Sequence, residues 1–301
     1  MRWKKLGLLY SPQSIHPKLA THAANPVGIL QHGDVYRVFF SGRDTQNRSS
    51  VGFVDVDILK HRVVYIHDKP VFEHGPEASF YSHGVSIGSW YEADGHRYIL
   101  FMGWQIPEGQ HWRGDIGRLR LQNDCSMELD VSGPFMGSDT TDQVSVSYPW
   151  VVRERDQYRM WYGSTVTWDA GNGEMLHVIN HATSVNGHEW TRLGLAVPYV
   201  IGKAQAFSRP TVVVDREGYH MWFSYRSGKP GDRYRIGYAY SASGKNWELR
   251  LADAAIDISA SGWDSEMIEY PFVFDHKGQR FMLYNGNGHG RTGFGLALLE
   301  S

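Results

Sequence analysis

Hydrophobic and polar positions follow one pattern that recurs five times along the chain. Each copy begins with a short apolar run, passes through a polar turn, and returns in a run rich in aromatic residues. The copies recur roughly every 60 residues, the spacing expected when one supersecondary unit is repeated. They start at Pro26, His83, Pro149, Pro210 and Pro271. No segment keeps a helical apolar period, so the pattern predicts strands.

Each copy contains further strand signals after its turn. The predicted second strands are Tyr36–Ser41, Tyr98–Gly103, Tyr158–Gly163, Tyr219–Ser224 and Arg280–Tyr284. The predicted third strands are Val51–Val56, Ile116–Leu121, His177–Thr183, Ile236–Tyr240 and Thr292–Leu298. After two of these, a Ser-x-x-Gly-x-x-Trp element turns the chain into a fourth, outer strand that an indole covers; the elements are Ser184–Trp190 and Ser241–Trp247.

Four strands per copy, repeated about a centre, predict an all-β fold: a five-bladed β-propeller with four-stranded antiparallel blades around a central funnel. Residues 1–301 are expected to form one domain. The strand signal at Leu6–Tyr10 has no copy of its own, so we expect it to supply the outer strand of the last blade. That pairing would close the ring and remove an exposed sheet edge.

Composition narrows the class of ligand. Aromatic residues make up 14% of the 301 residues, and they favour strands and stack on sugar rings. The net charge of −2 gives no electrostatic case for nucleic acid or an anionic membrane as partner. Cys125 is the one cysteine, and no apolar stretch is long enough to cross a membrane. With no signal-peptide pattern, these features predict a soluble, cytoplasmic protein.

Polar residues gather where the inner strands meet the axis, and the first group follows the strand Tyr36–Ser41. Arg43 and Arg48 flank Asp44 in this segment, an arrangement suited to clamping hydroxyls, a carboxylate or a phosphate. The alternative is a solvated hairpin held together by local ion pairs.

A second group leads into the last inner strand. Asp264, Glu266 and Glu269 lie within six positions and precede Tyr270. Glu269 is a candidate catalytic residue, and Asp264, Glu266 and Tyr270 are candidate substrate-binding residues. Neighbouring carboxylates in a partly dry cleft have their pKa values pushed apart, which suits acid–base chemistry. Turn formation by Asp264 is the structural alternative.

The third group surrounds a glycine-rich loop. Trp168 is a candidate sugar platform, Glu174 a candidate acid or base, and His177 a candidate hydrogen-bonding partner. An ordinary surface loop beside a strand histidine explains the same residues.

The fourth group consists of Arg209 and Arg226, which suit an anionic sugar or a phosphate. Asn25 and His83 hold matching positions at the mouths of the first two copies. No histidine pair has metal-ligand spacing, and no phosphate loop or nucleophile elbow is present. We therefore expect neither a metal nor a cofactor.

The repeat, the Ser41–Asp44 turn and the Tyr270–Gly286 segment resemble the five-bladed furanosidase-like superfamily, which includes glycoside hydrolase families 32, 43 and 130. The resemblance covers essentially the whole chain. Within the superfamily, the chain is most similar to bacterial propellers of the glycosidase-like kind. It implies a small-molecule carbohydrate or sugar-phosphate as ligand. In family 43, carboxylates stand at the mouths of the first three blades; here those mouths read Asn25-Pro26, Ser82-His83 and Tyr148-Pro149. The expected carboxylates are absent there, whereas hydrolysis of a glycoside ordinarily uses two of them.

Three functions remain open. The leading hypothesis is a glycoside hydrolase-like enzyme in which Glu269 protonates the leaving oxygen and Asp44 or Glu174 activates water or another acceptor. The arginines Arg43, Arg48, Arg209 and Arg226 would hold an anionic part of the substrate. The alternatives are a sugar-binding propeller without catalysis, and glycosyl or phosphoryl transfer from a nucleotide-sugar or sugar-phosphate.

Overall fold

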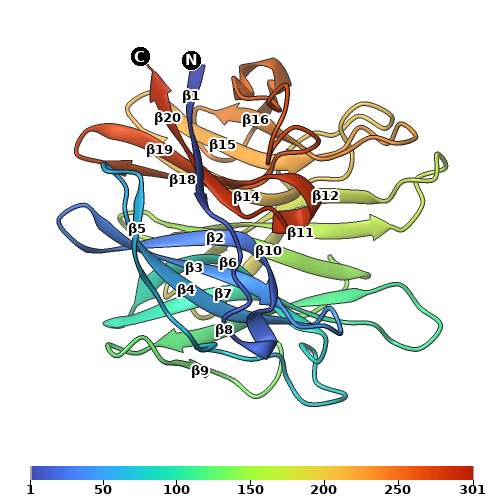
Figure 1. Ribbon diagram of the computed structural model, residues 1–301. Helices are drawn as coiled ribbons and strands as arrows, with labels where there is room; N and C mark the ends of the chain where they lie inside the picture. Colours follow the sequence, from blue (N-terminus) through green and yellow to red (C-terminus); the bar gives the residue numbers. More distant parts are fainter. Residues whose placement is uncertain (1, 301) are drawn as a thin grey trace.

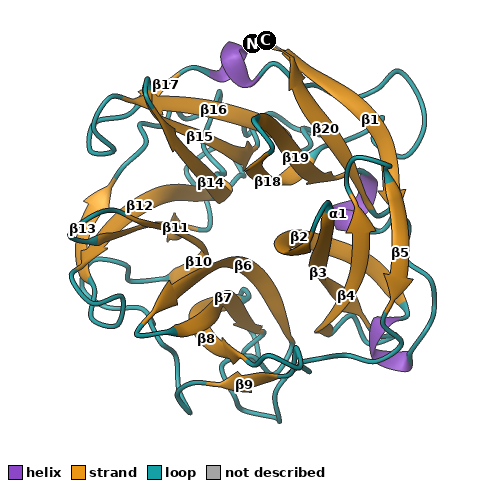
Figure 2. Ribbon diagram, turned by 90° about the vertical axis from the view of Figure 1, so that its left-hand side faces the viewer, coloured by secondary structure: helices purple, strands orange, loops and turns teal. Residues whose placement is uncertain are grey.

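The computed structural model describes residues 2–300, and strands account for almost all of its regular structure. The strands form four sheets arranged around a common centre (Figures 1 and 2). Three short helical segments interrupt them: Pro17–Leu19, Leu251–Ala254 and α1 (Asn287–Gly290). None of the helices described within residues 2–300 is long and apolar enough to span a bilayer.

Three sheets contain four antiparallel strands each. The first comprises β10 (Ser145–Arg153), β11 (Tyr158–Thr167), β12 (Leu176–Ser184) and β13 (Thr191–Leu195). The second comprises β14 (Ser208–Asp215), β15 (Gly218–Tyr225), β16 (Arg235–Ser241) and β17 (Glu248–Leu249). The third comprises β18 (Glu269–His276), β19 (Gln279–Asn285), β20 (Phe294–Glu300) and β1 (Arg2–Tyr10).

The fourth sheet has eight strands in two antiparallel groups. One group is β2 (Thr21–His32), β3 (Val35–Arg43), β4 (Ser49–Asp57) and β5 (Arg62–Ile66). The other is β6 (Gly84–Ala93), β7 (His96–Gln105), β8 (Arg113–Leu121) and β9 (Met127–Leu129). A single parallel pair, Ser49 with Gly84, joins β4 to β6. Each group therefore has the strand order of the other three sheets.

The arrangement confirms the predicted all-β propeller architecture and its four-stranded antiparallel sheets. Figure 2 shows β2, β6, β10, β14 and β18 nearest the centre, with later strands further out. The predicted second and third strands are all present. Their bounds are wider than predicted, except that the strand predicted at Thr292–Leu298 is shifted to Phe294–Glu300. The strand expected at Leu6–Tyr10 begins earlier, at Arg2, and pairs antiparallel with β20. Residues from the two ends of the chain thus complete one sheet (Figure 1).

The Ser-x-x-Gly-x-x-Trp elements form as predicted because their serines cap the turns. The Ser184 hydroxyl accepts a hydrogen bond from the Gly187 amide at 2.8 Å, and Ser241 does the same for Gly244 at 2.9 Å. The turn then delivers Trp247 against Trp161, with ring centroids 5.7 Å apart and nearly perpendicular planes. Apolar side chains from adjacent sheets fill the space between them in this way.

Each inner strand contains a bulge that interrupts its pairing with the second strand. In four of the inner strands, the residue before a proline adopts the left-handed backbone conformation. This conformation is unfavourable for residues other than glycine and for residues that precede proline. These residues are Asn25, Tyr148, Arg209 and Tyr270, with φ between 42° and 56°. A bulge changes which side chain faces the axis, so it decides which residues can reach a ligand there.

Candidate functional site

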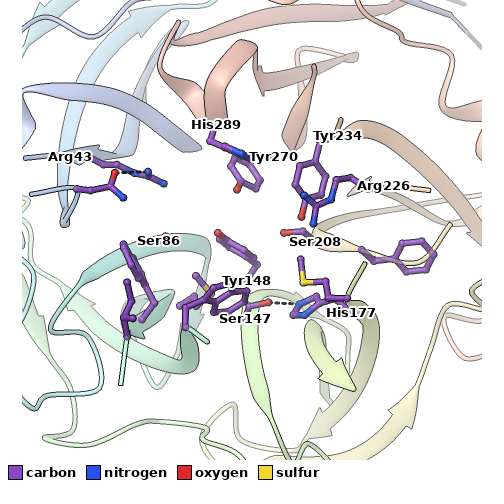
Figure 3. Close-up of a pocket in the computed structure, with 17 residues that line it drawn as sticks. Arg43, Ser86, Ser147, Tyr148, His177, Ser208, Arg226, Tyr234, Tyr270 and His289 are labelled. Carbon is purple, nitrogen blue, oxygen red and sulfur yellow. Dashed lines mark hydrogen bonds between the residues drawn. The ribbon is translucent and has the colours of Figure 1, made fainter. Parts of the chain in front are cut away.

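A cavity of about 350 Å³ lies where the inner strands begin and the second strands end (Figure 3). Serine and tyrosine side chains form much of its wall, together with two tryptophans, two arginines and two histidines. The residues that line it are Arg43, Asn47, Ser86, Met102, Trp104, Ile106, Trp112, Ser147, Tyr148, Met175, His177, Phe207, Ser208, Arg226, Tyr234, Tyr270 and His289. No Asp or Glu is among these described lining residues.

Two strained tyrosines stand side by side in the cavity. Tyr148 at the start of β10 and Tyr270 at the start of β18 have φ of 42° and 54°, and their ring centroids are 5.6 Å apart. Burial raises the pKa of both phenols, so both are neutral hydrogen-bonding groups at neutral pH. Backbone strain of this kind tends to persist at functional sites, where the surrounding structure holds it in place.

Glu269 is fully buried behind the cavity and is hydrogen-bonded to a histidine that lines it. Its Oε1 lies 3.0 Å from His289 Nδ1, while its Oε2 has no hydrogen-bond partner within residues 2–300. The Glu269 charge and this hydrogen bond raise the pKa of His289 above its usual 6.5. His289 is 45% exposed and lines the cavity, so Glu269 favours the protonated form of an imidazole that a ligand can contact.

The turn after β3 separates Arg43 from Arg48. Asp44 Oδ1 accepts hydrogen bonds from the amides of Gln46 and Arg48, and its Oδ2 accepts one from Arg48 Nε at 2.9 Å. Burial opposes ionisation of Asp44, but the bonds from Arg48 and Gln46 outweigh it and lower the pKa of the carboxyl. Of the predicted site residues in this turn, Arg43 lines the cavity and Asp44 and Arg48 do not.

Arg226 follows β15 and lies across the cavity from Arg43 (Figure 3). Its Nη2 donates to Glu174 Oε1 at 2.7 Å, and its guanidinium lies 4.7 Å from the Tyr234 ring centroid. Glu174 also accepts a hydrogen bond from the Met175 amide. The predicted acid or base at this position is thus an ion-pair partner of Arg226 that does not line the cavity.

His177 on β12 is buried between two hydroxyls. Its Nε2 lies 2.8 Å from Ser147 Oγ and its Nδ1 lies 2.7 Å from Thr165 Oγ1. Burial, followed by repulsion from Arg226, lowers the pKa of His177 to about 4. The imidazole is therefore neutral near pH 7 and orients Ser147.

Two predicted residues lie just behind the cavity wall. Trp168 stacks on His111 at 4.8 Å and packs edge-on against Trp112, one of the two tryptophans that line the cavity. His83 Nδ1 accepts a hydrogen bond from the Ile106 amide and lies near Ser82 Oγ. Both residues support the aromatic wall.

The structure places four other predicted site residues outside the cavity wall. Arg209 donates only to backbone carbonyls at the axis, and Asn25 is buried with its amide bound to Asn285. Asp264 pairs with Lys5 beneath β1, and Glu266 pairs with Arg233 at the surface. Their expected ligand contacts are replaced by contacts within the protein. Within residues 2–300 no cluster of three or more His, Cys, Asp or Glu could hold a metal ion.

Comparison with known proteins identifies relatives along the whole chain. No family model matches it. "Uncharacterized protein MT1551" and "Uncharacterized protein Rv1502", from two Mycobacterium tuberculosis strains, are each 42% identical to it over 303 residues, which is 100% of this chain and of theirs. The chain belongs to the family of these two proteins.

Solved structures confirm the resemblance to glycoside hydrolase-like propellers at the level of fold. A glycoside hydrolase superposes with a TM-score of 0.74 at 13% identity, covering 99% of this chain and 91% of that one. A glycosyl hydrolase from Bacteroides ovatus has a TM-score of 0.69 at 11% identity, covering 99% and 94%. A thermostable family-43 glycoside hydrolase has a TM-score of 0.69 at 14% identity, covering 92% and 89%. At such identities the similarity concerns architecture.

Sequence reasoning missed His289, which lies in the glycine-rich segment between β19 and β20. The structure has the short α1 there, with His289 at φ 57° between Gly288 and Gly290, whose φ values are 67° and 85°. This left-handed run turns the imidazole toward Glu269. A histidine between glycines, in the copy that carries a mouth carboxylate, was the available signal.

Proposed function

We propose that this chain is a carbohydrate-active enzyme, glycoside hydrolase-like, that cleaves or transfers a glycosidic bond in the cavity at the axis. The observation that carries the proposal is the His289 imidazole, held 3.0 Å from the buried Glu269 carboxylate and exposed to a cavity lined by tryptophans and tyrosines. The fold similarity to glycoside hydrolases supports it. We further propose to count β2–β5 and β6–β9 as separate blades, which gives one five-bladed domain.

In this mechanism His289 is the catalytic residue and Glu269 is a positioning residue. The imidazolium donates its proton to the glycosidic oxygen as the bond from that oxygen to the anomeric carbon breaks. Water or a sugar hydroxyl then adds to the anomeric carbon, and the proton it releases restores the imidazolium. Glu269 orients the ring through Nδ1 and stabilises its charge, as a buried carboxylate does for an imidazole general acid.

The test compares aryl glycosides that carry leaving groups of high and low pKa. We expect His289→Gln to lower turnover about 10²- to 10⁴-fold for poor leaving groups and much less for good ones, because only the poor ones need the proton. His96→Gln, at the exposed start of β7, is the matched control and should retain activity. Unchanged turnover of His289→Gln on every glycoside hydrolysed by the wild type would refute the assignment.

A second measurement addresses Glu269 separately. Since Glu269 raises the pKa of His289, activity should fall as the pH rises through that pKa, and Glu269→Gln should move this alkaline limb to lower pH. A merely structural role for Glu269 would lower activity at every pH and leave the limb in place.

The absence of Asp and Glu from the described cavity wall favours a second candidate, a sugar-binding propeller without catalysis. The two candidates differ in one result. Calorimetric binding of a sugar with no product after long incubation would support the binding module and contradict the enzyme.

A further inference from the structure

Arg43 lines the cavity as a cation that no carboxylate within residues 2–300 neutralises. Arg226 is paired with Glu174 at 2.7 Å, and His289 with Glu269 at 3.0 Å. By contrast, Arg43 forms none of the ion pairs found among the described residues, and its Nη1 donates to the neutral amide oxygen of Asn47 at 2.8 Å. With His289 protonated, the cavity therefore carries one positive charge in excess.

The local sequence explains why this charge stays free. Asp44 is adjacent to Arg43, but its oxygens are occupied by Arg48 and by the amides of Gln46 and Arg48. Asn47 adopts a left-handed conformation, φ 66°, which asparagine tolerates better than most residues. That conformation brings its side-chain oxygen to Arg43 and keeps the guanidinium at the cavity wall. The turn thus neutralises one arginine and exposes the other to a ligand.

The positive charges of Arg43, Arg226 and His289 add to the same electrostatic field in the cavity. Glu269 raises the pKa of His289, and repulsion from Arg43 and from Arg226 opposes that rise. Each arginine therefore lies within electrostatic reach of the imidazole. His22 is influenced in the same way: burial, and then Arg43 and Arg291, lower its pKa to about 4. A low-dielectric pocket with converging cations attracts an anionic group strongly.

We propose that Arg43 and Asn47 bind an oxyacid group, a carboxylate or a phosphate, of the sugar ligand, and that the substrate is an acidic sugar. This inference rests on the proposed function in taking the ligand to be a carbohydrate. The guanidinium presents planar, paired donors that match two oxygens of such a group, and the Asn47 amide adds a donor beside it. Figure 3 shows Arg43 and Arg226 at opposite sides of the cavity with His289 between them, so the anion is held in the same cavity as the proposed proton donor.

Binding at constant ionic strength tests the site with glucose, glucuronate and glucose 6-phosphate as probes. We expect at least one anion to bind about tenfold or more tightly than glucose, the gain of a charge-assisted pair. The anion that does so identifies the carboxylate or the phosphate as the recognised group. Arg43→Gln should abolish the preference for the anion. Arg43→Lys should keep part of that preference, because lysine retains the positive charge but lacks the paired N–H donors of the guanidinium.

Arg155→Gln is the charge-matched control, since Arg155 is exposed in the turn after β10 and forms no ion pair within the described chain. A preference that survives in Arg43→Gln overturns the proposal. So does an Arg43 Nε–H resonance in NMR that neither anion moves at about 10 mM, a concentration that detects even weak binding. Because binding is measured here and turnover above, either proposal can fail while the other stands.

Discussion

Arg209 shows how one side chain can stabilise the centre of the molecule. It is 1% exposed, and its guanidinium donates to the carbonyls of Tyr270, Pro271, Pro26 and Gly88 at 2.8 to 3.3 Å. These carbonyls belong to β18, β2 and β6, while Arg209 itself is on β14. Burial lowers the pKa of Arg209 to about 9, so it remains charged at neutral pH. The side chain thus joins four inner strands.

Arg209→Met should destabilise the protein severely at nearly constant side-chain volume. The substitution leaves four buried carbonyls without donors, and each costs about 1–3 kcal/mol. We expect the free energy of unfolding, measured in urea, to fall by several kcal/mol. Arg155→Met, at an exposed turn, should change the free energy of unfolding by no more than about 0.5 kcal/mol. A stable Arg209→Met protein would show that the carbonyls find other donors and that the axis does not depend on this residue.

At the scale of the strand, one backbone position that recurs in four strands is used in three ways. Asn25, Tyr148, Arg209 and Tyr270 all precede a proline in an inner-strand bulge with positive φ. Tyr148 and Tyr270 line the cavity, Arg209 joins strands at the axis, and Asn25 is buried. The shared bulge fixes the backbone, and the residue type then decides whether the position serves binding or stability.

These bulges also limit what the sequence could predict. The repeat identified the strand mouths and marked Glu269 in the last copy, because turn signals and apolar alternation depend on local sequence. The direction of each side chain depends on a bulge that breaks the alternation. The sequence therefore predicted both Glu269 and Tyr270 at the pocket, whereas the structure buries Glu269 and turns Tyr270, together with His289, to the ligand side. Likewise, no local pattern showed that Arg209 would donate to carbonyls from distant strands.

Strand β1 closes its sheet through a buried ion pair in addition to its backbone ladder. Lys5 Nζ lies 2.7 Å from Asp264 Oδ2, and Asp264, which is 2% exposed, also accepts a hydrogen bond from Tyr284 Oη at 3.0 Å. Trp3 on the same strand packs edge-on against Trp222 at 5.6 Å. Sequence patterning identified the strand but assigned Asp264 to the ligand, since the contact with Lys5 spans almost the whole chain.

Lys5→Met should therefore cost about 3–5 kcal/mol of unfolding free energy, because it leaves a buried carboxylate unpaired. In a double-mutant cycle, Asp264→Asn should recover part of that loss. The matched control is the exposed pair Glu266–Arg233, whose Glu266→Gln variant should lose at most about 1 kcal/mol. Equal effects at the two pairs would mean that β1 is held by its ladder and apolar contacts alone.

At the scale of the whole molecule, histidines should set the pH dependence of stability. Burial is the main cause that lowers the pKa of His22, His177 and His181 to about 4, from 6.5. Between these values the unfolded chain binds protons that the folded protein does not, so stability must rise with pH across that window. His289 acts in the opposite sense: its raised pKa adds stability below 6.5 that is lost as the pH rises through the folded value.

The two effects predict a maximum of stability near neutral pH. Each of the three buried histidines contributes up to about 1.4 kcal/mol per pH unit, so unfolding free energy should be several kcal/mol lower at about pH 5 than at about pH 7. His289→Gln should reduce the loss of unfolding free energy on the alkaline side, because the titration of His289 causes that loss. The loss on the acid side should be unchanged. Urea unfolding across this range measures both limbs, and NMR of the His177 ring should show no titration near 6.5. A flat acid limb, or a His177 that titrates near its ordinary pKa, would contradict the buried, neutral state of that histidine and with it the orientation of Ser147 in the cavity.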